Sequence, residues 1–476
     1  MRMVLGTFLL IVFLVHTAFA AIPATAVWEV RPTTGSNLNG GGYDSAFTGV
    51  GGSVDYTQQD AAQISFTDLS AVASTTLTSA AAGFTAAMVG NAVHLESAAV
   101  GTPGYYFITA FTDSSTVTID RSTTITTGVG KLGGATASYT GQTTTTLAAS
   151  LVAGNIGYHK GSGQTWNEAG VLGVAGTNAL PMVVEGYNTT RGDAPTGTLR
   201  PTNARAGAGT IGINITGGFY ILKHLVVSGA GTIGIQLTAN FGIFRNVRVT
   251  GSGTVGFEIN ANDVQLIQCE ADLNVSQGID LLGARDRVVS SYVHHNTMLG
   301  IQSTTSLDVS ILSSIIARNS GHGIWLTGTP DALIVGNTID CNSSAVSCGS
   351  SAVDGININT STDFDAGSVI TNNILSNNGR DGIRKVTSTG TNSNAYLDYN
   401  NYFGNVGAAR TNVAAGPHDL ALNPTYADAG GGNYAIGTNV QAQGFPGLFP
   451  AGLSRGYLDL GAVQSKGGGN VFQIFP

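Results

Sequence analysis

Three ionisable residues stand at one repeated position of the sequence. His322, Asp354 and Asp381 each come directly before a glycine that is followed by isoleucine. In five earlier copies of this glycine motif, the same position holds Ile211, Ile233, Val255, Gln277 and Leu299. Imidazole and carboxyl groups are common proton-transfer groups in enzymes. We therefore predict that His322, Asp354 and Asp381 form one catalytic edge.

Polar and aromatic residues close to these glycines could complete such a site. Arg384 and Lys385 are candidates for a catalytic base. Trp325, Asn357 and Arg380 are candidates for substrate binding, because two of them fall at the outward position of a predicted strand and Arg380 lies beside the edge.

The two carboxylates leave the type of chemistry open. Asp354 and Asp381 could hold Ca²⁺, although they supply only part of the roughly six to eight oxygens that Ca²⁺ prefers. Carboxylates one repeat apart would lie about 5 Å from each other, and those two repeats apart about 10 Å. These distances bracket the separations in retaining and inverting glycosidases, so lyase and hydrolase chemistry both stay open.

Other columns of the repeat also carry functional side chains. Two outward columns on three consecutive repeats contain Arg248, Glu270, Tyr292, Asp272 and His294. They could form a second active site or pair their charges on an exposed sheet. Glu258 and Asp280 occupy a third column, where two neighbouring like charges would raise one pKa.

A repeat of 22 residues must position all of these groups. It places a glycine and an apolar residue at Gly212, Gly234, Gly256, Gly278 and Gly300, and then, at longer steps, at Gly323, Gly355 and Gly382. Each glycine is followed by an apolar-polar-apolar strand pattern such as Ile279-Asp280-Leu281. One such unit cannot bury its own apolar face, so the units must stack. We predict an all-β parallel β-helix in which Ile279, Ile301, Ile324 and Ile356 form one buried row.

A second set of positions predicts the turns and one disulfide. Asparagine recurs after the third strand of each unit at Asn274, Asn296, Asn319 and Asn342, where it could adopt a left-handed bend and form a ladder of hydrogen bonds. Cys269 falls in an inward column. Cys341 and Cys348 are close enough in sequence to form a disulfide in an oxidising compartment.

The rest of the chain divides by pattern. Residues 1–20 have an apolar run and a small-x-small cleavage motif, which predicts a signal peptide and secretion. We assign residues 21–64 to an opening strand and cap, 65–133 to a small β insertion, 134–410 to the β-helix, and 411–476 to a C-terminal capping segment. No later segment is apolar enough to span a membrane. Only 10% of residues are charged and no basic run occurs, which argues against nucleic acid as a partner.

Several stretches resemble right-handed parallel β-helix proteins of the pectate-lyase-like class, namely "LIVGNTIDCN", "VITNNILSNNGRDGI" and "ARNSGHGI". That class includes lyases, hydrolases, epimerases, adhesins and phage spikes. The resemblance implies a secreted protein that binds polysaccharide and could cleave it as a lyase or glycoside hydrolase. The alternative is a non-catalytic glycan-binding adhesin or a structural surface or coat protein.

The resemblance also bears on the site. In polygalacturonase-like and lyase-like members, the catalytic acids lie at the start of the same kind of strand, and "GHGI" at Gly321 and "DGI" at Asp354 and Asp381 resemble fragments of that pattern. The adjacent aspartate pair and the Arg-x-Lys segment of those enzymes are missing here.

Overall fold

The computed structural model describes residues 22–48, 54–97, 103–139, 147, 150–161, 164–167, 170–343, 348–349, 351–359, 367–386, 395–441, 443–444 and 459–463. The predicted signal peptide lies outside this part of the chain. Within it, no helix is long and apolar enough to cross a membrane.

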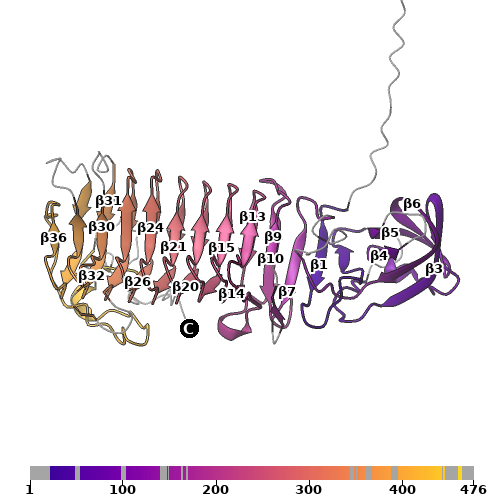
Figure 1. Ribbon diagram of the computed structural model, residues 1–476, viewed down its shortest axis with the longest axis horizontal. Helices are drawn as coiled ribbons and strands as arrows, with labels where there is room; N and C mark the ends of the chain where they lie inside the picture. Colours follow the sequence, from indigo (N-terminus) through magenta and orange to yellow (C-terminus); the bar gives the residue numbers. More distant parts are fainter. Residues whose placement is uncertain are drawn as a thin grey trace, which may run out of the picture.

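Short parallel strands stack into a β-helix with three sheets, which we number in the order that each coil passes through them (Figure 1). Sheet 1 contains β9 (Gly170–Leu172), β12 (Ile213–Ile215), β15 (Ile235–Leu237), β18 (Phe257–Ile259), β21 (Ile279–Leu281), β24 (Ile301–Thr304), β27 (Ile324–Thr327), β30 (Ile356–Ile358), β33 (Ile383–Lys385) and β36 (Arg410–Thr411). The strands from β12 to β33 are the ones that follow the repeated glycines, as the sequence predicts.

Sheet 2 is the longest of the three. It contains β2 (Gly42–Asp44), β1 (Ala26–Val30), β7 (Ile156–Lys160), β10 (Met182–Tyr187), β13 (Tyr220–Lys223), β16 (Ile243–Arg245), β19 (Gln265–Ile267), β22 (Arg287–Val289), β25 (Ser310–Leu312), β28 (Leu333–Val335), β31 (Val369–Thr371) and β34 (Tyr396–Asp398). All neighbours pair in parallel except β1 and β2, which are antiparallel.

Sheet 3 completes each coil. It contains β8 (Thr165–Trp166), β11 (Thr202–Ala204), β14 (Val226–Ser228), β17 (Arg248–Thr250), β20 (Glu270–Asp272), β23 (Tyr292–His294), β26 (Ile315–Ala317), β29 (Thr338–Asp340), β32 (Ile374–Ser376) and β35 (Asn401–Phe403).

The predicted isoleucine row is confirmed. Ile279 pairs with Ile301, Ile301 with Ile324, and Ile324 with Ile356, and all four are fully buried. Because the side-chain period of a strand is two, this register turns the middle residue of each strand outward. The middle residues of sheet 1 therefore form one file along its outer face.

The repeated glycines serve close packing. Gly278 lies at a bend directly before β21, but its φ is not positive. A Cβ atom at Gly278 would come within 2.5 Å of Val293 Cγ1 and 2.7 Å of Asn296 Nδ2. The glycine is required because sheet 3 and its asparagine turn pack directly against it.

The asparagine ladder is confirmed. The Asn274 amide donates to Asn296 Oδ1 at 2.9 Å, Asn296 to Asn319 at 2.9 Å, and Asn319 to Asn342 at 3.0 Å. The predicted left-handed bend is one residue earlier, for example at Leu273 (φ 57°), and the asparagine side chain supports that bend from inside. Cys269 is buried in the stack, as expected.

A four-stranded antiparallel sheet lies at the N-terminal end of the β-helix (Figure 1). It contains β3 (Ile64–Thr78), β6 (Thr116–Leu132), β4 (Ala92–Ser97) and β5 (Gly104–Asp113), with the 3-10 turn η1 (Ala86–Met88) beside it. Its residues form a separate apolar core. Trp28 on β1 packs edge-on against Tyr105 and Phe107, which joins this sheet to the β-helix.

The C-terminal segment covers the later coils of sheet 3. Tyr434 and Ala462 pack against Tyr292, Ile315 and Ala317 on the outer face of that sheet. The 3-10 turn η4 (Thr438–Val440) brings Val440 into a second contact with sheet 3, and η3 (Gly197–Leu199) precedes β11. Sheet 3 is therefore a partly covered face, whereas the file on sheet 1 lies on a different side of the β-helix.

Candidate functional site

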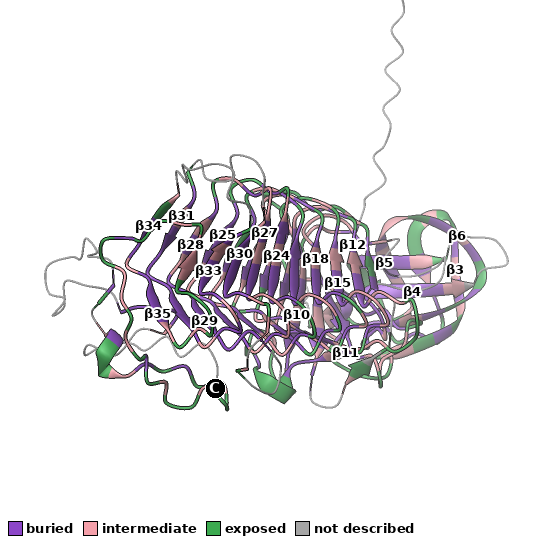
Figure 2. Cartoon of the chain, turned by 60° about the vertical axis from the view of Figure 1, so that its left-hand side comes forward, coloured by how far each residue is buried: buried purple, intermediate pink, exposed green. Residues whose placement is uncertain are grey.

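The file on sheet 1 is polar except for one tryptophan. The middle residues of its strands are, in spatial order, Asn214, Gln236, Glu258, Asp280, Gln302, Trp325, Asn357 and Arg384. Figure 2 shows the strands of this sheet in one row, with buried and half-buried residues along it. Each coil thus adds one functional side chain about every 4.8 Å.

The structure brings the predicted catalytic edge together beside this file. The backbone N–H of Asp354 donates to His322 Nδ1 at 2.8 Å, and the rings of His322 and Trp325 lie 6.3 Å apart. Because Nδ1 accepts, the proton of the neutral imidazole is on Nε2. Burial lowers the pKa of His322, despite the nearby Asp354 carboxylate, so the neutral ring is favoured.

Asp354 accepts hydrogen bonds on both of its carboxylate oxygens. Its fully buried carboxylate accepts from Arg380 Nε at 2.7 Å and Nη2 at 2.6 Å. Asn357 Nδ2 donates to it at 2.6 Å, and the Asp381 N–H donates at 3.3 Å. Arg380 and Asn357, which we predicted to bind substrate, are thus occupied with a buried charge.

Asp381 is also a poor candidate for Ca²⁺ ligation. It is 3% exposed and accepts from Arg384 Nη1 at 3.2 Å and from the Ala408 N–H at 2.8 Å. A calcium ion shared with Asp354 would have to displace two arginines from two buried carboxylates. The pair therefore does not fit the predicted calcium site.

Lys385 points the wrong way for the predicted base. It pairs with Ile358, whose column faces the core, and it is only 5% exposed. The prediction placed Lys385 beside an outward Arg384, but adjacent residues on a strand point to opposite faces. Arg384 does lie in the outward file.

Glu258 and Asp280 are neighbours within the file. They pair across adjacent strands β18 and β21. Burial and the charge of Glu258 raise the pKa of Asp280 to about 6. The charge effect that the sequence suggested is therefore present, and burial adds to it.

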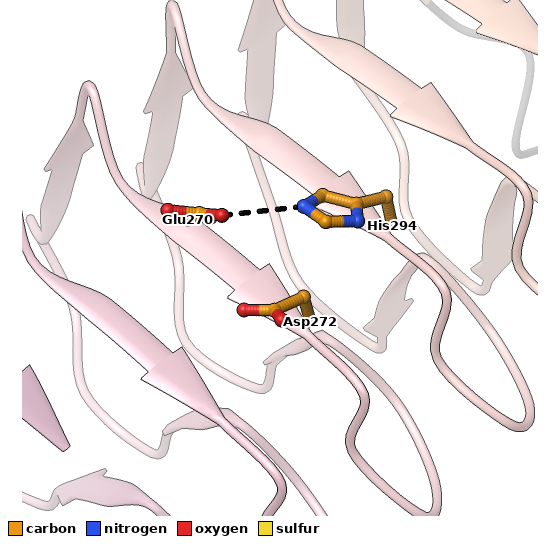
Figure 3. Close-up of side chains that lie close together, drawn as sticks. All are labelled: Glu270, Asp272 and His294. Carbon is orange, nitrogen blue, oxygen red and sulfur yellow. Dashed lines mark hydrogen bonds and ion pairs between the residues drawn. The ribbon is translucent and has the colours of Figure 1, made fainter. Parts of the chain in front are cut away.

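A separate cluster lies on the outer face of sheet 3 (Figure 3). Glu270 and His294 point toward each other from adjacent strands, with Oε1 and Nε2 3.4 Å apart. Asp272 accepts two 2.8 Å hydrogen bonds from Arg248. Burial alone would raise the pKa of Glu270, but the hydrogen bond to His294 and the charge of Arg248 outweigh burial and lower it.

This cluster is best explained by charge pairing. Among the described residues, one group of histidine, cysteine or acidic side chains is close enough to share a metal ion. It consists of Glu270, Asp272 and His294. Asp272 is nevertheless occupied by Arg248, and Arg200 Nη2 lies 3.6 Å from Glu270. A cation would have to compete with both guanidinium groups, so the cluster is a stabilising ion-pair network.

Sheet 2 presents a third outer face. An open hollow of about 500 Å³ is lined there by Asp263, Gln265, Arg285, Arg287, Asp308, Ser310, Asp331 and Leu333. Arg285 forms two 2.7 Å hydrogen bonds to Asp263, and both are solvated. The hollow has mixed charge, and Asp308 and Asp331 lie at equivalent positions on adjacent coils, just before the paired strands β25 and β28.

A disulfide joins Cys341 and Cys348, the pair expected from the sequence. We predicted that the insertion between Asn342 and Asp354 forms a groove wall beside His322. Residues 344–347 and 350 of that insertion lie outside the described part of the chain.

The repeats of the β-helix match a known family of sequences. Residues 211–401 match the family described as "Right handed beta helix region". The chain is a right-handed parallel β-helix repeat protein, as its repeat and its resemblance implied.

Comparison with curated protein sequences gives no match. Among solved structures, the pectate lyase Pel9A is 14% identical, with 66% of this chain and 89% of that chain covered and a TM-score of 0.44. An alginate lyase from Paenibacillus sp. str. FPU-7 is 12% identical, with 58% and 93% covered and a TM-score of 0.35. A GH136 lacto-N-biosidase from Eubacterium ramulus is 11% identical, with 57% and 62% covered and a TM-score of 0.38.

The carboxyl groups that the sequence made prominent differ from those that lie without an arginine partner in the structure. Asp354 and Asp381 stand out because they replace aliphatic residues, yet both are paired with arginine. Glu258 and Asp280 were less prominent because every neighbour in their column is also polar. The signal for them was two acids exactly one repeat apart with no basic residue beside them in the column.

Proposed function

We propose that the protein binds a polysaccharide along the outer face of sheet 1. The observation that carries this proposal is Trp325, a half-buried aromatic ring in an otherwise polar file. Aromatic rings supply a large apolar contact, while neighbouring amides and carboxyls can hydrogen-bond hydroxyl groups. A regularly spaced file suits a ligand that is itself an extended chain of repeated units.

The neighbours of Trp325 support binding of such a chain. Gln302 precedes it by one coil, and its amide donates to Thr304 Oγ1 at 2.9 Å, which fixes the orientation of the amide. Neutral His322 turns Nε2–H away from its bond to Asp354, so it can donate to a ligand oxygen. Arg384 extends the polar surface by two further coils.

We further propose that the protein works outside the cytoplasm. The disulfide between Cys341 and Cys348 supports this location, because disulfides persist mainly in oxidising compartments.

Affinity electrophoresis and calorimetry against a panel of neutral and acidic polysaccharides test the binding proposal. Trp325→Ala should weaken binding at least tenfold, which corresponds to about 1.4 kcal/mol. Phe241→Ala is the matched control, because Phe241 is an exposed aromatic residue stacked on Phe219 in the turn between sheets 1 and 2, outside the file. Binding that survives Trp325→Ala, or no binding to any polysaccharide, would contradict the proposal.

A further inference from the structure

We infer that Glu258 and Asp280 are a catalytic carboxyl pair that hydrolyses a glycosidic bond in a neutral glycan. The inference rests on the proposed function, because it requires a glycan on the outer face of sheet 1. Glu258 and Asp280 occupy paired middle positions of β18 and β21. Adjacent strands lie about 4.8 Å apart, close to the roughly 5 to 5.5 Å between the two carboxyl groups of retaining glycosidases.

Two hydrogen bonds orient the Glu258 side chain. Gln236 Nε2 and Asn260 Nδ2 both donate to Glu258 Oε1 at 2.7 Å. Two donors on one oxygen fix the side-chain rotamer. Both groups donate to Oε1, so Oε2 is the oxygen that would act as the nucleophile.

Asp280 has the opposite environment. It is 9% exposed, and its Oδ1 is buried without a hydrogen-bond partner among the described residues. A buried oxygen without a partner is costly in a structural carboxylate and is expected where a ligand supplies the missing contact. Burial and the charge of Glu258 raise the pKa of Asp280 to about 6, so a proton is retained in mildly acidic solution. The two groups thus differ in the way that a nucleophile and a proton donor must differ.

The reaction balances with water alone. Asp280 gives its proton to the glycosidic oxygen as the bond from that oxygen to the anomeric carbon breaks, and Glu258 Oε2 bonds to the anomeric carbon. The released sugar leaves as an alcohol. Water then attacks the anomeric carbon, Asp280 takes the proton of that water, and the bond to Glu258 breaks. Both carboxyl groups return to their starting states, and one new reducing end is formed.

The charges on this face select a neutral glycan. The carboxylate of a uronic acid next to Glu258 would meet a like charge. The cationic groups of the described face, Arg380 and Arg384, are each paired with a buried aspartate, at 2.6 Å and 3.2 Å. Neither cation is placed to neutralise a uronate beside Glu258.

The test measures binding and cleavage separately on the full chain. Neutral substrates such as xylan and β-glucan and acidic ones such as polygalacturonate and alginate are assayed for reducing ends and for the ultraviolet absorbance of unsaturated products. On a neutral substrate that binds, Glu258→Gln and Asp280→Asn should each lower the rate at least a hundredfold. Asp263→Asn, on the sheet 2 side, is the control and should keep full activity. Activity of the native protein should fall as the pH rises through about 6.

Azide distinguishes a nucleophile from a positioning group. In Glu258→Ala, azide should restore bond cleavage and give a glycosyl azide, which a purely structural role of Glu258 would not produce. Thermal unfolding checks that the variants fold, and we expect Asp280→Asn to keep or raise the melting temperature. If a neutral glycan binds but is not cleaved, the inference is overturned and the proposed function remains. Cleavage that survives both Glu258→Gln and Asp280→Asn has the same two consequences. Preferred cleavage of polyuronates overturns the inference, and no binding to any glycan overturns both.

Discussion

Asp286 is a carboxyl group in a column of core residues. It directly precedes β22, as Val264, Val309 and Ala332 directly precede their strands, and like them it is buried. Its Oδ1 accepts the N–H of Val264 at 2.9 Å, whereas Oδ2 is buried without a partner among the described residues. Burial raises the pKa of Asp286 from 3.8 to about 7, with a smaller contribution from the charge of Asp263. We therefore predict that Asp286→Asn stabilises the protein at neutral pH.

The magnitude follows from the pKa difference. A folded-state pKa that is raised means that the native protein binds more protons than the unfolded chain between pH 3.8 and about 7. The stability of the native protein therefore falls as the pH rises through this window, by at most about 4 kcal/mol for a shift of roughly three units. Asparagine has the shape of the protonated acid and keeps the acceptor for Val264. The two proteins should be equally stable near pH 3.5, and the advantage of Asp286→Asn should grow up to about pH 7.

Urea unfolding followed by circular dichroism from pH 3.5 to 8 measures this difference. Asp263→Asn is the control in the preceding coil, because Asp263 is solvated and its ion pair with Arg285 lowers its pKa. That substitution should change the stability by less than about 1 kcal/mol near neutral pH. A stability difference between Asp286→Asn and the native protein that does not change with pH would refute the reasoning.

Two further substitutions test the buried polar contacts. Arg380→Met should destabilise the protein by about 3 to 5 kcal/mol, because it leaves the Asp354 charge buried without its partner; adding Asp354→Asn should recover much of the loss in thermal unfolding, and no recovery would contradict this account. Asn296→Ala should cost about 3 kcal/mol or more, since it removes a ladder member and orphans the Asn274 amide. A change in melting temperature no larger than that of a surface substitution would show that the ladder is dispensable.

The fold could be predicted because one repeat determines both the length of each coil and which residues face the core. The glycine step of 22 residues sets the coil length, and the alternation in strands such as Ile279–Leu281 sets which residues face inward. The Asn296 ladder follows from the same spacing, whereas the disulfide was predicted from the short separation of Cys341 and Cys348. The bend before Asn296 and the tight packing around Gly278 could not be read from sequence, because they depend on how sheet 3 meets sheet 1 in three dimensions.

The site was harder to predict for a physical reason. A column in the sequence shows which residues become neighbours, but the pKa and reactivity of a carboxyl group depend on which of its neighbours donates to it. Asp354 stood out because an acid replaced an aliphatic residue at its position. In the structure, however, its carboxylate accepts a hydrogen bond from Arg380 on the next coil. Asp280 looked ordinary among polar residues, yet its coil neighbours are Glu258 and Gln302, and neither donates to its buried oxygen. In a β-helix, a reactive carboxyl group is therefore better sought where a column lacks a cation on both adjacent coils than where the column merely changes from apolar to acidic.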